Sequence, residues 1–130
     1  MQEALNYYAH KLMYEIDSWD LQELISHREN VIVIDARSES AFQKEHIPGA
    51  LSLPHRKMNS QTVEELDRTA LIVTYCDGIG CNASTKGALA MTRLGFQVKE
   101  LIGGLDWWKR DGYQTQGELS GNTSPVCGCE

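Results

Sequence analysis

The chain has 130 residues, 42% of them hydrophobic and 23% charged, which suits one globular domain with a single core and leaves little room for two. Its formal net charge of −6, from 12 Lys and Arg against 18 Asp and Glu, argues against sequence-independent binding to nucleic acid, because that binding relies on clustered cations. No apolar run approaches the roughly 18 residues of a membrane helix, and residues 1–16 lack the basic start and cleavage site of a signal peptide, so we expect a cytoplasmic protein without nucleic-acid or membrane partners.

Two helices are predicted at the N-terminus, within residues 1–28. Four apolar residues recur there at spacings of three and four, the pattern of one helical stripe: Leu5, Tyr8, Leu12 and Ile16. Ser18 is a suitable N-cap for a second helix. We expect this helical extension to cover apolar surface of the domain, with a dimer interface as the alternative.

A core of alternating strands and helices is predicted over residues 29–115. Residues 31–34 and 71–75 are short, continuous apolar runs, typical of strands buried on both faces, and residues 97–101 form a third strand. Helices are predicted at residues 38–44, 62–66, 82–94 and 105–110; the second rests on a capping box begun by Thr62. In the last of them, Trp107 and Trp108 are adjacent, so one is expected to pack inward. This alternation predicts an α/β fold with helices on both faces of the sheet.

A glycine-containing loop begins at Cys76, directly after the second strand and before the long helix. Gly78 and Gly80 allow the backbone to curl so that several amides form an anion-binding nest. The positive N-terminal end of the helix adds to this effect, and both favour a thiolate at Cys76. We therefore predict a nucleophilic sulfur surrounded by main-chain amides at the sheet edge; a Cys76 packed in the interior, with those amides turned elsewhere, would contradict this picture.

The sequence resembles the rhodanese family of sulfurtransferases in three stretches. The first is VIDAR at residues 33–37 with HIPGA at 46–50, the second is VTYC at 73–76 with its loop, and the third is LIGGL at 101–105 with Trp108 and Tyr113. Together they cover about residues 31–113. The resemblance implies a central parallel sheet of about five strands, with a catalytic cysteine, Cys76, at the start of a six-residue loop.

The resemblance also implies a reaction. Cys76 would take sulfane sulfur from thiosulfate or a persulfide donor, carry it as a persulfide, and pass it to cyanide or a thiol acceptor, with no cofactor or metal. The persulfide would be held by the loop residues Asp77, Gly78, Ile79, Gly80, Cys81 and Asn82. The alternative is a non-catalytic redox or sulfur-carrier module that uses Cys76 and Cys81. A cysteine phosphatase is disfavoured, because its loop closes with an arginine where Asn82 stands here.

The loop departs from the family pattern in its charges. Many rhodanese loops carry arginine at the second or sixth position, where this sequence has Asp77 and Cys81. A carboxylate beside the nucleophile would repel a thiosulfate dianion. The cations that are candidates to replace the missing arginines, as substrate contacts, are Arg37, Arg56, Lys57 and Lys86.

The remaining cysteines leave several roles open. In a reducing compartment, we expect thiols, catalysts or metal ligands rather than structural disulfides. Cys81 is a candidate for a resolving thiol that leaves a disulfide, for a metal ligand, or for a small apolar residue at the start of a helix. Cys127 and Cys129 lie in a Gly/Ser-rich tail, residues 116–130, predicted to be flexible; they are candidates for sulfur relay or soft-metal binding, or have no function. The expected oligomeric state is a monomer or weak homodimer.

Overall fold

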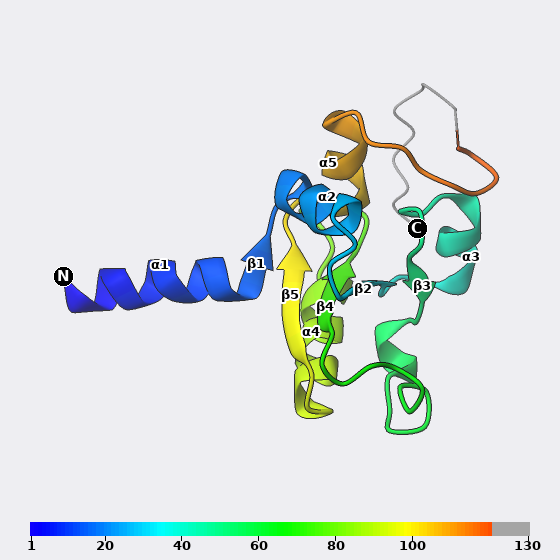
Figure 1. The fold of residues 1–130 in the computed structure, drawn as a ribbon. Helices are drawn as coiled ribbons and strands as arrows, with labels where there is room; N and C mark the ends of the chain where they lie inside the picture. Colours follow the sequence, from blue (N-terminus) through cyan, green and yellow to red (C-terminus); the bar gives the residue numbers. More distant parts are fainter. Residues whose placement is uncertain (121–130) are drawn as a thin grey trace.

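The computed structural model describes residues 1–120. At its centre is a parallel sheet of five strands in the order β1-β5-β4-β2-β3 (Figure 1). The strands are β1 (Glu15–Ile16), β2 (Val31–Asp35), β3 (Leu51–Ser52), β4 (Leu71–Tyr75) and β5 (Gln97–Leu101). The predicted α/β architecture with a parallel sheet is confirmed.

Helices cover both faces of this sheet, because successive strand residues point to opposite sides. On one face, Val33 and Val73 pack with α2 (Ser18–Ser26) and α5 (Gly104–Arg110). On the other face, Ile34 and Ile72 pack with α4 (Ala83–Arg93). Two short elements, α3 (Glu39–Lys44) and the 3₁₀ helix η1 (His55–Lys57), follow β2 and β3. Trp108 is 2% exposed and Trp107 46% exposed, so the predicted division between the two tryptophans is confirmed.

One predicted helix is absent and one predicted N-cap is wrong, both because of local hydrogen bonds. Residues 60–66 form turns rather than a helix. There the side chain of Asn59 accepts hydrogen bonds from the amides of Gln61 and Thr62, while the Thr62 hydroxyl donates to the carbonyl of Lys57. These side-chain bonds compete with helical ones. In α2, Asp17 is the N-cap, accepting from the Asp20 amide at 2.8 Å, and Ser18 is the first helical residue.

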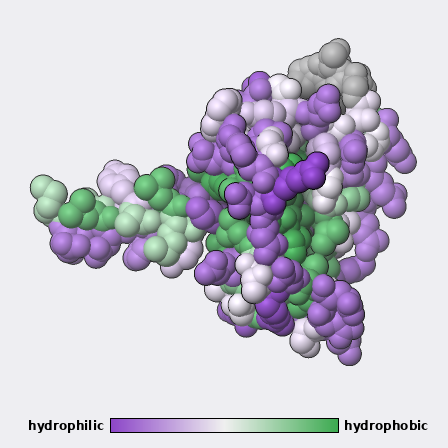
Figure 2. Space-filling view, viewed as in Figure 1, coloured by the Kyte–Doolittle hydropathy of each residue, from purple (hydrophilic) through white to green (hydrophobic). Residues whose placement is uncertain are grey.

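The N-terminal helix α1 (Gln2–Tyr14) does not cover the domain as predicted. It has no buried residue and projects away from the sheet at the β1 edge (Figure 1). Apolar side chains lie on the surface of this helix (Figure 2). Leu5 is 58% exposed and Leu12 is 77% exposed. Ile16 leaves the helical stripe and enters β1, which pairs with β5. Whether α1 joins two copies of the chain stays a prediction.

Deletion of α1 is expected to leave the stability of the domain almost unchanged, because the helix buries none of its residues. A chain lacking residues 2–12 should unfold within about 2 °C of the full chain. For comparison, a loss of 1 kcal/mol lowers the melting temperature by roughly 4–8 °C in domains of about 60–100 residues and by roughly 2–4 °C in domains of about 150–250 residues. Circular dichroism during heating measures this. The matched control also removes residues 13–16, including the buried Ile16, and should lower the transition by at least about 8 °C. Equal melting of both deletions would contradict the prediction.

One further boundary differs from expectation. The tail predicted to begin at residue 116 is still bonded to the domain: the amides of Glu118 and Leu119 donate to the carbonyls of Gln43 and Lys44 at 3.1 and 2.8 Å. Cys127 and Cys129 lie outside the described residues. Among residues 1–120, no helix is long and apolar enough to cross a membrane.

Candidate active site around Cys76

The candidate site lies at the carboxyl edge of the sheet, where Cys76 directly follows β4. This strand is flanked by β5 and β2, and α4 begins at Ala83 after the loop. In parallel α/β sheets, loops at this edge form the binding crevices. The hydroxyl of Thr74 donates to the Ser84 carbonyl at 3.0 Å, which ties the first turn of α4 to β4 beside the loop.

Cys76 and Cys81 are joined by a disulfide, with their Cα atoms 6.2 Å apart. The amide of Cys81 donates to the Gly78 carbonyl at 3.2 Å, and this turn brings the two ends of the loop within the 4.4–6.8 Å range that a disulfide requires. The general expectation of free thiols is therefore wrong for this pair. Of the roles left open for Cys81, the structure shows that of a disulfide partner.

Cys76 is more enclosed than the sequence suggested: only 1% of it is exposed. Its disulfide partner Cys81 is partly exposed at the end of the loop. This interior location is one of the two conditions that would contradict the predicted amide nest; the other is that the loop amides are turned away from Cys76. Among residues 1–120, no hydrogen-bond acceptor is assigned to the amides of Gly78, Ile79 or Gly80, and their role in anion binding stays a prediction.

The first half of the loop is held by α5. The amide of Leu105 donates to the Cys76 carbonyl at 2.9 Å, and the amide of Asp106 donates to the Asp77 carbonyl at 2.7 Å. This approach requires Gly104, whose φ is +57°. A Cβ on Gly104 would lie 2.9 Å from the Gly78 amide nitrogen and also overlap the Cys76 carbonyl oxygen. The LIGGL stretch thus places a helix N-terminus directly against the cysteine loop.

Arg37 holds Asp77 from the other side. Its Nη1 donates to Asp77 Oδ1 at 2.8 Å, its Nε and Nη2 donate to the Asp35 carboxylate, and Nη2 also donates to the Glu45 carbonyl at 2.6 Å. Burial alone would lower the pKa of Arg37, but the bonds to Asp35 and Asp77 and the charge of Asp35 raise it above its ordinary value. With its side chain 5% exposed, Arg37 is a positioning residue for the loop, and the predicted substrate contact is not supported.

The other candidate cations divide into two groups. Lys57 forms an exposed ion pair with Glu39 at 2.8 Å. Arg56 and Lys86 both act on His55: partial burial lowers the pKa of His55 below its ordinary value, and the charges of Lys86 and Arg56 lower it further. The His55 amide donates to the Ala36 carbonyl at 3.2 Å, which places His55 at the carboxyl end of β2, next to β4.

Three groups near the disulfide have the chemistry of metal ligands. The sulfurs of Cys76 and Cys81 and a carboxylate oxygen of Asp77 lie within 4.8 Å of one another. In this state both sulfurs are bonded to each other and Asp77 accepts from Arg37. The oxidised loop is therefore not a set of free ligands.

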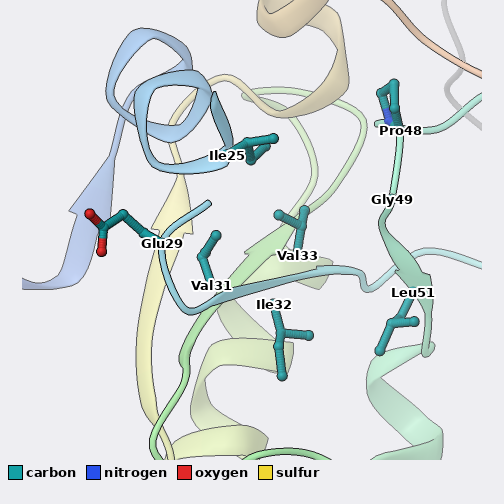
Figure 3. Close-up of a pocket in the computed structure, with 8 residues that line it drawn as sticks. All are labelled: Ile25, Glu29, Val31, Ile32, Val33, Pro48, Gly49 and Leu51. Atoms are coloured by element: carbon teal, nitrogen blue, oxygen red, sulfur yellow. The ribbon is translucent and has the colours of Figure 1, made fainter. Parts of the chain in front are cut away.

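A separate apolar pocket lies between α2 and the strands β2 and β3 (Figure 3). Ile25 reaches it from α2, Val31 and Val33 from β2, and Leu51 from β3. Glu29 is its one charged lining residue. None of the lining residues belongs to the Cys76 loop, so this pocket is distinct from the sulfur site.

Known proteins are similar to this chain over most of its length. The rhodanese-like domain model matches residues 19–111. The thiosulfate sulfurtransferase GlpE of Coxiella burnetii is 28% identical over 102 residues, covering 77% of this chain and 88% of that protein. A protein named sulfurtransferase from Allochromatium vinosum is 29% identical over 101 residues, 78% of this chain and 92% of that protein. The crystal structure of the BH2092 protein from Bacillus halodurans is 40% identical, with a TM-score of 0.90 over 96% of this chain and 92% of that chain. The chain belongs to the rhodanese-like domain family.

Proposed function

We propose that the chain is a sulfurtransferase that carries sulfane sulfur as a persulfide on Cys76. The observation that carries the proposal is the position of this cysteine, fixed after β4 by the α5 amides and followed by a loop with available amides. Family membership and the two relatives named as sulfurtransferases support sulfur transfer in general. Thiosulfate or a low-molecular-weight persulfide as donor, and cyanide or a thiol as acceptor, are the finer parts of the proposal.

The reaction begins from the reduced loop, since the disulfide leaves Cys76 without a free sulfur. The Cys76 thiolate attacks the outer sulfur of the donor, the donor's sulfur–sulfur bond breaks, and sulfite or a thiolate leaves with the electron pair. The acceptor thiolate then attacks the outer sulfur of the persulfide and regenerates the Cys76 thiolate. The amides of Gly78, Ile79 and Gly80 and the N-terminal end of α4 stabilise the negative outer sulfur.

The charge of Asp77 is less unfavourable to an anionic donor than its sequence position suggested. Its carboxylate is bonded to the Arg37 guanidinium, so much of its field is cancelled before it reaches the donor. Arg56 and Lys86, whose charges act on His55 near the carboxyl end of β2, supply the positive potential that draws an anion toward the site. The combination replaces the loop arginines of other rhodaneses.

Intact-mass analysis tests the proposal. The chain is reduced, freed of reductant under anaerobic conditions, and treated with thiosulfate. We expect a Cys81→Ser variant to gain one sulfur, located on Cys76 by peptide mapping, because this variant cannot form the loop disulfide. A Cys76→Ser variant should gain none and should lose transfer to cyanide. Full transfer activity in Cys76→Ser would show that another residue is the nucleophile.

The disulfide itself favours a second candidate function, a redox module that uses the Cys76–Cys81 pair without turnover. This candidate predicts reversible thiol oxidation by mild oxidant and no transfer with any sulfur donor. Thiol titration before and after oxidant, combined with transfer assays on thiosulfate and glutathione persulfide, separates the two functions.

A further inference from the structure

We propose that Cys81 resolves the Cys76 persulfide and releases its outer sulfur as hydrosulfide, so that the Cys76–Cys81 disulfide is the product state of this reaction. The inference rests on the proposed function for its first half, the formation of the persulfide. It adds an acceptor built into the chain, where the proposed transfer uses an external thiol.

The disulfide shows that the Cys81 sulfur reaches the Cys76 sulfur without disturbing the fold. The same approach is needed for attack on a persulfide, because the atom attacked is the Cys76 sulfur itself. Cys76 stays in place for this attack: its carbonyl and that of Asp77 are bonded to α5 amides at 2.9 and 2.7 Å, and the Asp77 carboxylate is bonded to Arg37.

The second half of the loop is built differently from the first. Ile79 is 85% exposed, and a Cβ on Gly80 would meet nothing within 4 Å. Apart from the turn between Cys81 and Gly78, this segment has no assigned backbone hydrogen bond among the described residues. Cys81 can therefore move away to admit a donor and return to the persulfide, while the nucleophile remains fixed.

Cys81 is also placed to react as a thiolate. It precedes Asn82, the N-cap of the 11-residue helix α4, and a helix N-terminus favours a negative group. The side chain of Asn82 makes no capping hydrogen bond, so none of the first amides of α4 is satisfied by that side chain. The disulfide with Cys76 connects Cys81 to sulfur chemistry independently of the helix.

The step balances without a further reactant. The Cys81 thiolate attacks the Cys76 sulfur, a bond forms between the two cysteine sulfurs, and the bond between the Cys76 sulfur and the outer sulfur breaks. The outer sulfur leaves as hydrosulfide with the electron pair of that bond and takes the proton that the Cys81 thiol releases when it forms the thiolate. Two electrons pass from the cysteine thiols to the sulfane sulfur, which is reduced. A dithiol reductant must then reopen the disulfide before another donor can be used.

The test measures sulfide and protein mass in a single turnover. Reduced chain is freed of reductant, treated anaerobically with thiosulfate, and assayed with a sulfide-reactive dye. All proteins carry Cys127→Ser and Cys129→Ser, so that no tail cysteine can resolve the persulfide. We expect the chain with Cys81 to release about one sulfide per molecule and to end two hydrogens lighter than the reduced form. Cys81→Ser should hold its persulfide and release at least about tenfold less sulfide.

The possible results separate this inference from the proposed function. Persulfide on Cys81→Ser together with sulfide from the chain that retains Cys81 supports both. Stable persulfide on both proteins overturns the resolving role but leaves sulfur transfer intact. No added sulfur and no sulfide from either protein overturns both. A Cys81→Ala variant, checked by circular dichroism, should behave like Cys81→Ser; equal sulfide release from it would also overturn the resolving role.

Discussion

Replacing Gly104 by alanine is expected to lower the rate of sulfur transfer by about 10²-fold, which is the cost of a displacement of about 1 Å at a reacting group. The new methyl group would overlap the Cys76 carbonyl oxygen and come within 2.9 Å of the Gly78 nitrogen. Both are backbone atoms, which cannot rotate away. The left-handed φ of +57° adds about 1–2 kcal/mol for a residue with a side chain.

The loop, rather than the helix, should yield to this methyl group. Leu105 and Trp108 anchor α5 in the core at 4% and 2% exposure, so moving the helix outward would expose large apolar side chains. The matched control is Gly112→Ala, at a φ of +89° with nothing within 4 Å of its Cβ. It should lose about 1–2 kcal/mol of stability and keep transfer within about twofold. Steady-state assays and thermal unfolding of both variants test this. Equal transfer rates would show that the close contact of Gly104 with the loop does not hold Cys76 in position.

Much of the fold follows from short-range patterns in the sequence. The apolar runs at β2 and β4 identify buried parallel strands because they lack alternation, and the glycine at residue 95 marks the end of α4. The turn HIPGA contributes to the core in a way that a pattern alone does not show: the Ile47 amide donates to the Tyr75 hydroxyl at 3.1 Å. Burial raises the pKa of Tyr75 above its ordinary value, as does the charge of Asp35, so this hydroxyl stays neutral and bonded.

The errors arise where distant segments meet. β1 has only two residues, too few to show periodicity, and it forms because β5 offers an edge with which it pairs. The path of α1 depends on where β1 pairs, which its helical stripe does not encode. The hydrogen bond from Arg37 to Asp77 joins residues 40 positions apart. The sequence therefore placed Arg37 near the site but could not show that its guanidinium is already bonded to carboxylates of the protein.

Replacement of Arg37 is expected to cause the largest loss of stability, because its guanidinium pairs with two buried carboxylates. Replacing Arg37 by methionine keeps an apolar stem but leaves two carboxylates without their partner: Asp35, fully buried, and Asp77, with a side chain 10% exposed. Removing one member of a buried ionic network costs about 3–5 kcal/mol. Since domains have a total stability of about 5–15 kcal/mol, we expect a marginally folded variant, measured by urea unfolding.

Two further variants separate the loss of charge from the loss of packing. Arg37→Met combined with Asp77→Asn should be more stable than Arg37→Met alone, because one uncompensated charge is removed and the two changes are coupled. Arg110→Met is the control for removal of an arginine from an exposed pair, in which the side chains are 60% and 54% exposed; it should cost at most about 1 kcal/mol. If the double variant is no more stable than the single one, the network acts by packing rather than by neutralising Asp77. Pairing with Arg37 would then not explain how an acidic residue is accommodated beside Cys76.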